Sequence, residues 1–306
     1  MAFSDLYDKQ VRLLMRVLPY VAEESCFALK GGTAINLFIR DLPRLSVDID
    51  LTYLPVAERG RSLSDIDMAL KRIGERIGEA DNHMTITASA PGSQSEINKL
   101  VVRTKDRVQI KIEVTPVLRG CVYDPVPLSV VPKAEDIYGF AEIKVLSFAD
   151  IYAGKIIAAL DRQHPRDLFD VHQLLENEGI TDDLRTALIV YLVSHDHSPH
   201  SLLNPVLRDI SRDFEQNFVG MTAEDITLDV LLETRDALIA DVVSNMPDVH
   251  KVFLRSFYRR QPEWALLGVE GVENLPAVRW RELNLDKSGP GTCEEILRKL
   301  EKVISS

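Results

Sequence analysis

The fold of this chain is decided by the stretch Phe27–Leu51, FALKGGTAINLFIRDLPRLSVDIDL, in which two adjacent glycines precede an Asp-x-Asp pair. Strands place residues i and i+2 on the same face, so Asp48 and Asp50 point away from a core that takes Ile49 and Leu51. The two carboxylates then lie about 7 Å apart along the strand. Like charges this close are costly unless a cation neutralises them, and divalent metals with hard oxygen ligands supply one. This strand is therefore predicted to bind a metal ion that carries a nucleotide.

The segment before the Asp pair predicts a phosphate-binding turn. Residues 26–30, CFALK, form a short apolar run suited to a buried strand. Gly31 and Gly32 then permit a sharp turn and a close approach of ligand to backbone, and Thr33 is predicted to cap a helix over residues 34–40. Alone, such a turn is equally consistent with a simple change of chain direction that binds no ligand. Followed by the Asp pair, it favours a cradle for phosphate groups at a helix start.

A third carboxylate is predicted on a neighbouring strand. In residues 108–114, VQIKIEV, apolar residues alternate with Gln109, Lys111 and Glu113, and Pro116 ends the run. Two-metal transfer to a phosphorus centre needs a ligand besides the Asp pair. An ordinary amphipathic strand with a solvated outer face is the alternative. Together with the Asp pair, the pattern favours Glu113 as a metal ligand.

A helix after residue 147 carries a candidate for phosphate binding. Ser147-x-x-Asp150 is similar to a capping box, and the predicted helix over residues 151–160 contains Lys155. A lysine beside a triphosphate supplies a positive charge and three hydrogen-bond donors. The alternative is a solvated surface lysine.

The next helix supplies two acidic candidates. Pro165 suits the first position of this helix, in which Asp167 and Asp170 lie three residues apart on one side. The helix dipole alone favours Asp167 in a first turn. Arg166 or Lys155 is its expected partner, which would make Asp167 a residue that positions the lysine.

The order of predicted elements indicates an α+β protein. Residues 1–130 are predicted to form a mixed sheet flanked by helices, with helices over 7–22 and 64–80 and strands near 84–90, 100–104 and 108–115. From about residue 147 the pattern is helical almost throughout, including 182–192, 225–243 and 294–304. The expected domains are therefore 1–130 and 131–306, joined by the proline-rich segment 124–132. The active site is expected in the cleft between them.

Composition excludes several classes of protein. With 306 residues and 45% hydrophobic residues the chain can bury two cores. No apolar run has the length needed to cross a membrane, and the first residues lack the pattern of a secretory signal. Three isolated cysteines, Cys26, Cys121 and Cys293, fit a reducing, cytoplasmic location without zinc. A His cluster at residues 195–200 is interpreted as a loop between helices rather than a metal site.

Charge is distributed unevenly. The net charge of −11 argues against indiscriminate binding of nucleic acid. Residues 99–119, however, carry six basic and two acidic side chains, which favours contact with RNA phosphates beside the Asp pair. A second basic patch with aromatic residues is expected near the C-terminus, at Arg255, Arg259 and Arg260 with Phe257, Tyr258 and Trp264. A solvated strand edge and an ordinary helix face are the alternatives.

Three segments together resemble a known family. GGTAINLF followed by Arg44-x-Ser46-x-Asp48-x-Asp50 is similar to the minimal nucleotidyltransferases of the DNA-polymerase-β type, and within them to the AbiEii/AbiGii toxin family of bacterial abortive-infection and toxin–antitoxin systems. SFADIYAGKIIAAL with RDLFD resembles the family's lysine helix and Arg-Asp-x-x-Asp motif, and LPAVRW at 275–280 resembles its C-terminal Pro-Ala-Val-x-Trp signature. The spacing between the glycines and the Asp pair is longer than in the shortest members, which leaves the path of that loop open.

The resemblance implies a Mg²⁺-dependent nucleotidyltransferase that acts as the toxin of an anti-phage abortive-infection or toxin–antitoxin system. It implies transfer of a nucleotide from an NTP, with CTP or UTP ahead of GTP or ATP, to the 3′ end of tRNA, which blocks translation. It also implies an antitoxin partner, and a toxin that is monomeric without it. Residues 1–130 would be the nucleotidyltransferase domain and 131–306 a helical C-terminal domain. The implied metal ligands are Asp48, Asp50 and Glu113; these three with Lys155 and Asp167 are the catalytic residues; and the nucleotide-binding residues are Lys30, Gly31, Gly32, Thr33, Ser46, Lys155, Arg166 and Asp170.

Two other functions remain open. A related transferase would modify a small molecule or a protein side chain instead of RNA. A non-catalytic nucleotide-binding module on the same fold is the other alternative, and it would require lost metal ligands, whereas all three carboxylates are present here.

Overall fold

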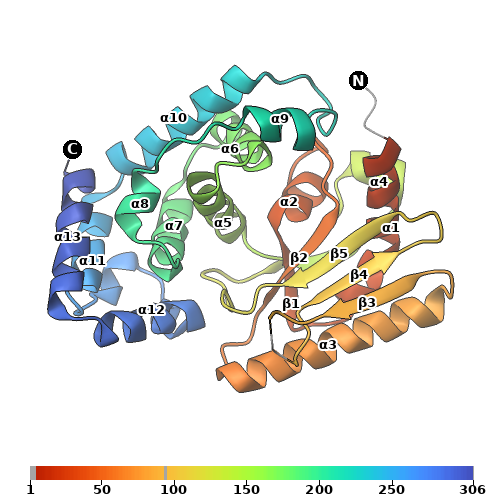
Figure 1. Cartoon of the computed structure of the whole chain (residues 1–306), viewed down its shortest axis with the longest axis horizontal. Helices are drawn as coiled ribbons and strands as arrows, with labels where there is room; N and C mark the ends of the chain where they lie inside the picture. The colour runs from red at the N-terminus through yellow and green to blue at the C-terminus, as the bar shows by residue number, and fades with distance from the viewer. Residues whose placement is uncertain (1–4, 93–94, 306) are drawn as a thin grey trace. The chain divides into compact units, whose positions relative to one another are not determined.

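The computed structural model describes residues 5–92 and 95–305. Within them the chain forms two compact units, one made of residues up to 147 together with 220–225, the other of residues 148–219 together with 226 onward (Figure 1). The first unit contains a sheet with helices and the second is helical. The predicted α+β class is confirmed.

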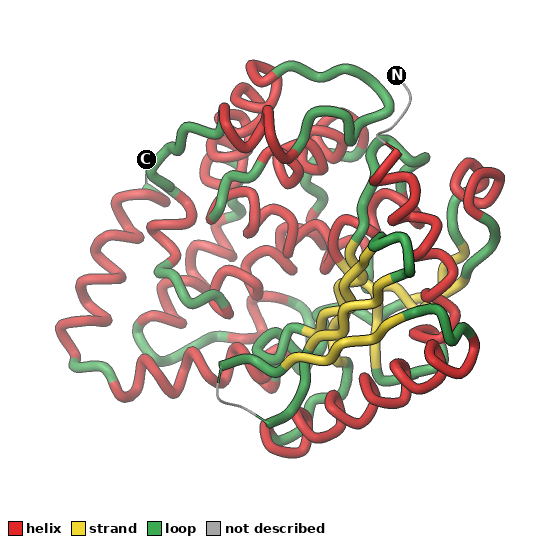
Figure 2. Tube along the Cα trace, turned by 45° about the vertical axis from the view of Figure 1, so that its right-hand side comes forward, coloured by secondary structure: helices red, strands yellow, loops and turns green. Residues whose placement is uncertain are grey.

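The first unit is built on a mixed sheet of seven strands in the order β3-β4-β5-β2-β1-β7-β6. The pairs β2/β5 and β1/β7 are parallel and the other neighbours are antiparallel. Figure 2 shows the strands as one layer. Their bounds are β1 Phe27–Lys30, β2 Asp48–Tyr53, β3 Thr85–Ser89, β4 Lys99–Arg103, β5 Gln109–Val114, β6 Val126–Ser129 and β7 Glu142–Val145.

Two long helices cover one face of this sheet. α1 contacts β5 and β7, α3 contacts β3 and β4, and the helices touch each other. The buried residues of both helices recur with helical spacing, so each turns one apolar stripe to the strands. On β2 this face takes Ile49 and Leu51, both fully buried, and leaves Asp48 and Asp50 on the opposite face. The helices of this unit are α1 Asp5–Ala22, α2 Gly31–Ala34, the π-helical turn η1 Ile35–Ile39, α3 Arg59–Ala80 and α4 Pro132–Tyr138.

The segment expected as a linker, residues 124–132, contributes to the sheet. It contains β6, and Pro127 in this strand lies opposite Lys144 of β7. Proline lacks the backbone N–H of a central strand but is tolerated at a sheet edge, which is where β6 lies. The prolines that predicted a linker thus mark an edge strand, and the first unit continues to residue 147.

The second unit consists of helices packed around α5. α5 packs against both α6 and α7. Pro165 occupies the first position of α6, as predicted from its fixed φ angle. Within the described part of the chain, no helix combines the length and the apolar character needed to cross a bilayer. The helices are α5 Phe148–Asp161, α6 Pro165–Asn177, α7 Asp182–Ser194, α8 Pro199–Leu203, α9 Ser211–Asn217, α10 Leu228–Ser244, α11 Asp248–Tyr258, η2 Trp264–Leu267, η3 Val272–Asn274, α12 Pro276–Lys287 and α13 Pro290–Ile304.

Candidate active site

A row of four charged side chains crosses the centre of the sheet. Lys30 on β1 lies opposite Asp50 on β2, and Asp50 lies opposite Glu113 on β5. Glu113 in turn lies opposite Lys99 on β4, and the Lys99 Nζ is 3.0 Å from the Glu113 Oε2. Neighbouring strands lie about 4.7–4.9 Å apart, so the register brings both carboxylates together between two lysines.

Asp48 belongs to the same face, two residues before Asp50. It lies opposite Lys111 of β5, and the intervening Ile49 is fully buried on the other face. The alternation predicted for this strand therefore holds at the Asp pair. It ends at Thr52, which is buried although it follows the two acids on their face.

The donor chemistry of this face fits a divalent cation. Carboxylate oxygens are the ligands that Mg²⁺ prefers, and Asp48 and Asp50 present them side by side from one rigid strand. Among the residues that the structure describes, no group of three or more His, Cys, Asp or Glu side chains is already arranged to hold a metal ion. At this sheet the Glu113 carboxylate is paired with Lys99 of β4.

Both glycines of the turn are required by the residues around them. Gly31 has φ of +73°, and a Cβ there would lie 2.8 Å from the Asp50 Oδ2. A Cβ on Gly32 would lie 2.7 Å from Arg44 Nη2 and 2.8 Å from Ser46 Oγ. The turn is thus packed directly against the Asp pair and the serine that precedes it, which explains why sequence motifs far apart in the chain belong together.

Thr33 does not cap the helix, contrary to the prediction. The helix begins at Gly31, so Thr33 lies inside it, fully buried. Its hydroxyl donates to the backbone oxygen of Asp48 at 2.5 Å and lies 3.1 Å from the Ser46 Oγ. The Thr33 side chain therefore ties the turn to the start of β2, and only its backbone is left for a nucleotide.

Lys30 is placed beside the two carboxylates of the row. Its Nζ donates to Thr115 Oγ1 at 2.9 Å. Burial lowers the pKa of Lys30, while the charges of Asp50 and Glu113 act in the opposite direction. The lysine offsets part of the repulsion between the acids and is suited to attract an anionic substrate.

Replacing Gly31 by alanine is expected to lower activity about 100-fold, because the new Cβ displaces the Asp50 carboxylate and misplacement by about 1 Å has this effect. The matched control is Gly139→Ala. Gly139 has φ of +92°, but no atom lies within 4 Å of the position that a Cβ would take there, so that variant tests backbone strain alone. Equal activity of the two variants in a transfer assay would contradict the packing argument.

A second charged cluster lies inside the helical unit. The Lys155 Nζ is 2.7 Å from the Asp167 Oδ1 and 3.0 Å from the Asp170 Oδ2. Arg162 approaches Asp167 with two nitrogens, Nε at 2.5 Å and Nη2 at 2.9 Å. Lys155 is only 7% exposed and both acids are almost completely buried. The alternative of a solvated surface lysine is therefore wrong.

The partners of Asp167 differ in part from the prediction. Lys155 is one of them, but Arg162 takes the place that Arg166 was expected to fill. Burial raises the pKa of Asp167, yet the charges of Lys155 and Arg162 outweigh it and hold this pKa well below its usual value. The sequence contained the signal for Arg162, because it follows Lys155 by seven residues and so shares its helix face.

The expected C-terminal RNA patch is contradicted by the structure. Phe257 and Tyr258 are each 1% exposed, so these two rings do not offer a stacking surface, and the partly buried Trp264 packs against Phe257. Arg255 is held by the carboxylate of Glu301 at 2.8 and 3.0 Å. The helical periodicity that places aromatic residues beside arginines here serves core packing.

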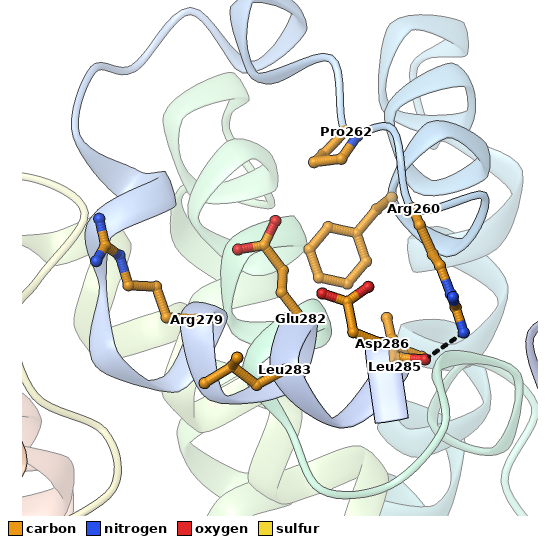
Figure 3. A pocket seen from close by; sticks show the side chains of 8 residues that line it. Arg260, Pro262, Arg279, Glu282, Leu283, Leu285 and Asp286 are labelled. Carbon is orange, nitrogen blue, oxygen red and sulfur yellow. Dashed lines mark hydrogen bonds between the residues drawn. The ribbon is translucent and has the colours of Figure 1, made fainter. Parts of the chain in front are cut away.

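A pocket of about 370 Å³ at this place has two acids and two arginines in its lining (Figure 3). Glu282 and Asp286 point into it from α12, while the side chain of Arg279 points away. Arg260 donates to the backbone oxygen of Leu285 at 2.7 Å, so its charge is engaged at the rim. The two acids balance the two arginines, so this pocket lacks the basic surplus that was expected of an RNA site.

His195 and His197 lie in the loop that was predicted, whereas His200 lies in α8. His195 follows the end of α7, and its Nδ1 accepts a hydrogen bond from the backbone N of His197. His197 Nδ1 is 2.7 Å from the Asp161 Oδ1. These contacts stabilise the connection between α7 and α8.

Comparison with known proteins identifies the family and the fold of the chain. The model of one protein family, the nucleotidyl transferase AbiEii toxin of the type IV toxin–antitoxin system, matches residues 12–277. The fold is similar to that of MenT4, a nucleotidyltransferase toxin from Mycobacterium tuberculosis H37Rv, with a TM-score of 0.55 and 14% sequence identity over 96% of this chain and 93% of that chain. No curated protein matches the chain.

The family match covers most of the chain and confirms the resemblance drawn from the motifs. It includes the glycine turn, the Asp pair, Glu113 and the Lys155 cluster. A toxin of such a system implies an antitoxin as its partner. This chain therefore belongs to the AbiEii family and is a nucleotidyltransferase toxin of a type IV toxin–antitoxin system.

Proposed function

We propose that this toxin transfers a nucleotide from an NTP to the 3′ end of tRNA and so blocks translation. The observation that carries the proposal is the row of Lys30, Asp50, Glu113 and Lys99 beside a glycine turn. Two acids between two lysines suit a reaction in which an anionic substrate, a cation and a hydroxyl group meet. In the cell this activity would serve abortive infection against phage, and it would be held in check by the antitoxin.

The residues of the sheet have separate roles in this reaction. Asp48, Asp50 and Glu113 would hold Mg²⁺, which when bound neutralises charge on the phosphates and on the leaving pyrophosphate. The turn at Gly31 and Gly32 would receive the triphosphate on its backbone N–H groups, with Lys30 and Ser46 beside it. The donor is expected to be CTP or UTP ahead of GTP or ATP.

The proposed reaction is a single displacement of pyrophosphate at the α-phosphorus. The terminal hydroxyl oxygen of the acceptor forms a bond to the α-phosphorus, and the bond from that phosphorus to the β-phosphate oxygen breaks, which releases pyrophosphate in line. Glu113 accepts the proton of the hydroxyl group once its ion pair with Lys99 has opened. Lys99 is the first residue of the basic segment 99–119 that was expected to contact RNA, and its release would leave it free to face the acceptor.

The Lys155 cluster is assigned a positioning role. Asp167 and Asp170 both engage the Lys155 ammonium, so this lysine is held in one place. A fixed ammonium group loses little entropy when it meets a phosphate. We assign Lys155, with Arg166, to the nucleotide phosphates and assign Asp167 and Asp170 to holding the lysine.

The proposal is tested by incubating the purified toxin with Mg²⁺, total tRNA and each α-³²P-labelled NTP in turn. Label on tRNA with one pyrimidine nucleotide, lost when EDTA is added, is the expected result. Loss of the label after removal of the terminal nucleotides places it at the 3′ end. Label on protein, or none with any NTP, would overturn the tRNA assignment and favour another acceptor or a nucleotide-binding module.

A further inference from the structure

Arg119, in the loop after β5, is a buried cation without a counter-ion among the described residues. Its side chain is 7% exposed. The guanidinium atoms Nε and Nη1 are buried and have no hydrogen-bond partner in the described part of the chain. A buried charge is costly unless it is paired, and buried arginines are normally hydrogen-bonded. Two buried guanidinium nitrogens without a partner in the described part of the chain therefore indicate a partner from outside it.

The neighbours of Arg119 increase the positive charge. Arg59, the first residue of α3, is close enough that its charge, after burial, is the main cause of the lowered pKa of Arg119. The positive end of the dipole of α3 lies at the same place. Glu58 is the nearby acid, but its Oε2 caps the helix by accepting from Gly60 N at 3.1 Å and Arg61 N at 3.4 Å. The helix N–H groups are thus satisfied, and the cationic side chains are left to hold an anion.

The loop that carries Arg119 lies at the carboxyl end of the catalytic strands. Gly120 N donates to Tyr53 O at 2.8 Å, and Tyr53 is the last residue of β2. β2 and β5 are parallel, so the segments that follow them leave at the same edge of the sheet. Tyr53 follows Asp50 by three residues, about 10 Å along the strand.

This position is separated from the expected triphosphate site. β1 runs antiparallel to β2, with Phe27 opposite Tyr53 and Lys30 opposite Asp50. The glycine turn, which follows Lys30, therefore lies towards the beginning of β2, whereas Arg119 lies beyond its end. A phosphate at Arg119 would therefore belong to the acceptor of the reaction. The acceptor would extend past the metal-binding face towards the end of β2.

We propose that Arg119, supported by Arg59, binds a backbone phosphate of the RNA acceptor strand. The inference rests on the proposed transfer to tRNA and names a contact for that acceptor. A guanidinium group matches a phosphate with two parallel hydrogen bonds, and such contacts fix the register of a nucleic acid without reading its sequence.

The test measures RNA binding without catalysis. A fluorescent single-stranded RNA with a tRNA acceptor sequence is titrated in EDTA with the wild type, Arg119→Gln, Arg119→Lys and the control Lys133→Gln, which removes an exposed charge of the same unit outside the basic segment 99–119. Arg119→Gln should weaken binding about tenfold and reduce the salt slope by about 0.7, the share of one single-strand phosphate. Arg119→Lys should retain part of the affinity, and Lys133→Gln should retain nearly all of it.

Thermal unfolding of the free proteins separates binding from structure. Arg119→Gln should be at least as stable as the wild type, because it removes an unpaired buried charge. A less stable variant would show that Arg119 has an internal partner and would overturn the proposal. Unchanged RNA affinity and salt slope in folded Arg119→Gln would overturn it as well.

A further arm distinguishes the two sources of phosphate. If pyrophosphate or NTP binding is lost in Arg119→Gln while RNA binding is kept, the site belongs to the nucleotide and the acceptor contact is wrong. If the toxin labels tRNA but the wild type and Arg119→Gln bind RNA with equal affinity, the Arg119 contact alone is overturned. A toxin that binds RNA through Arg119 but transfers no nucleotide overturns the proposed function alone.

Discussion

Asp50→Asn is expected to reduce nucleotidyl transfer at least about 1000-fold while the protein remains folded. Asp50 is the central carboxylate of the row, opposite Lys30 on one side and Glu113 on the other. The asparagine keeps the size of the side chain but removes the charge that would hold a divalent cation. Stability should change little, because the substitution relieves repulsion with Glu113 and leaves that acid to balance Lys30.

The measurement compares label transfer and thermal unfolding of Asp50→Asn with those of the wild type and of Asp106→Asn. Asp106 is an exposed acid in the same unit, so its variant controls for the loss of one negative charge. Activity of Asp50→Asn within tenfold of the wild type would rule out the metal-ligand role. Toxicity on expression should follow the same order, with the wild type and Asp106→Asn harmful and Asp50→Asn harmless.

Local pattern was sufficient to predict the carboxylate face. Alternation with a period of two placed Asp48, Asp50 and Glu113 on the polar sides of two strands, because one face of each strand had to be buried. The fixed φ of proline likewise predicted the start of α6 at Pro165. These features depend on a few neighbouring residues, so a single sequence contains them.

Features that depend on pairing between distant segments were not predictable. The register that sets Lys99 opposite Glu113 links residues of two strands, and no pattern within either strand specifies it. Thr33 has the chemistry of a helix cap, but tertiary contact with Asp48 and Ser46 uses its hydroxyl instead. Local propensity was overridden in each case by a contact across the sheet.

The burial of individual side chains was the other property that the sequence did not predict. The aromatic residues beside the C-terminal arginines suit RNA stacking as well as core packing, and only the fold shows that Phe257 and Tyr258 are internal. The same ambiguity applied to Lys155, whose apolar surroundings on α5 indicate burial only when its acidic partners on α6 are known.

Asp167→Asn is expected to destabilise the protein by about 3 kcal/mol, because breaking a buried ion pair from one side leaves poorly compensated charge. Asp167 is 1% exposed and pairs with both Lys155 and Arg162. The alternative for this residue is a favourable interaction with the helix dipole alone, which is worth about 0.3–1 kcal/mol. Asp183→Asn is the matched control, since Asp183 is an exposed acid in the first turn of α7. If the two variants lose similar amounts of unfolding free energy in urea at pH 7, Asp167 contributes no more than its interaction with the helix dipole.

The pH dependence of this loss provides an independent check on the ion pair. The pKa of Asp167 in the folded protein lies well below its ordinary value of 3.8, because Lys155 and Arg162 outweigh the effect of burial. A depressed folded pKa gives stability that is present above the unfolded pKa and is lost as the pH falls towards the folded pKa. The difference in unfolding free energy between the wild type and Asp167→Asn should therefore be constant from pH 7 to pH 5 and should shrink below about pH 4. A difference that stays constant down to about pH 3 would show that the Asp167 carboxylate is not held ionised by these cations, and the role assigned to it in fixing Lys155 would fall with it.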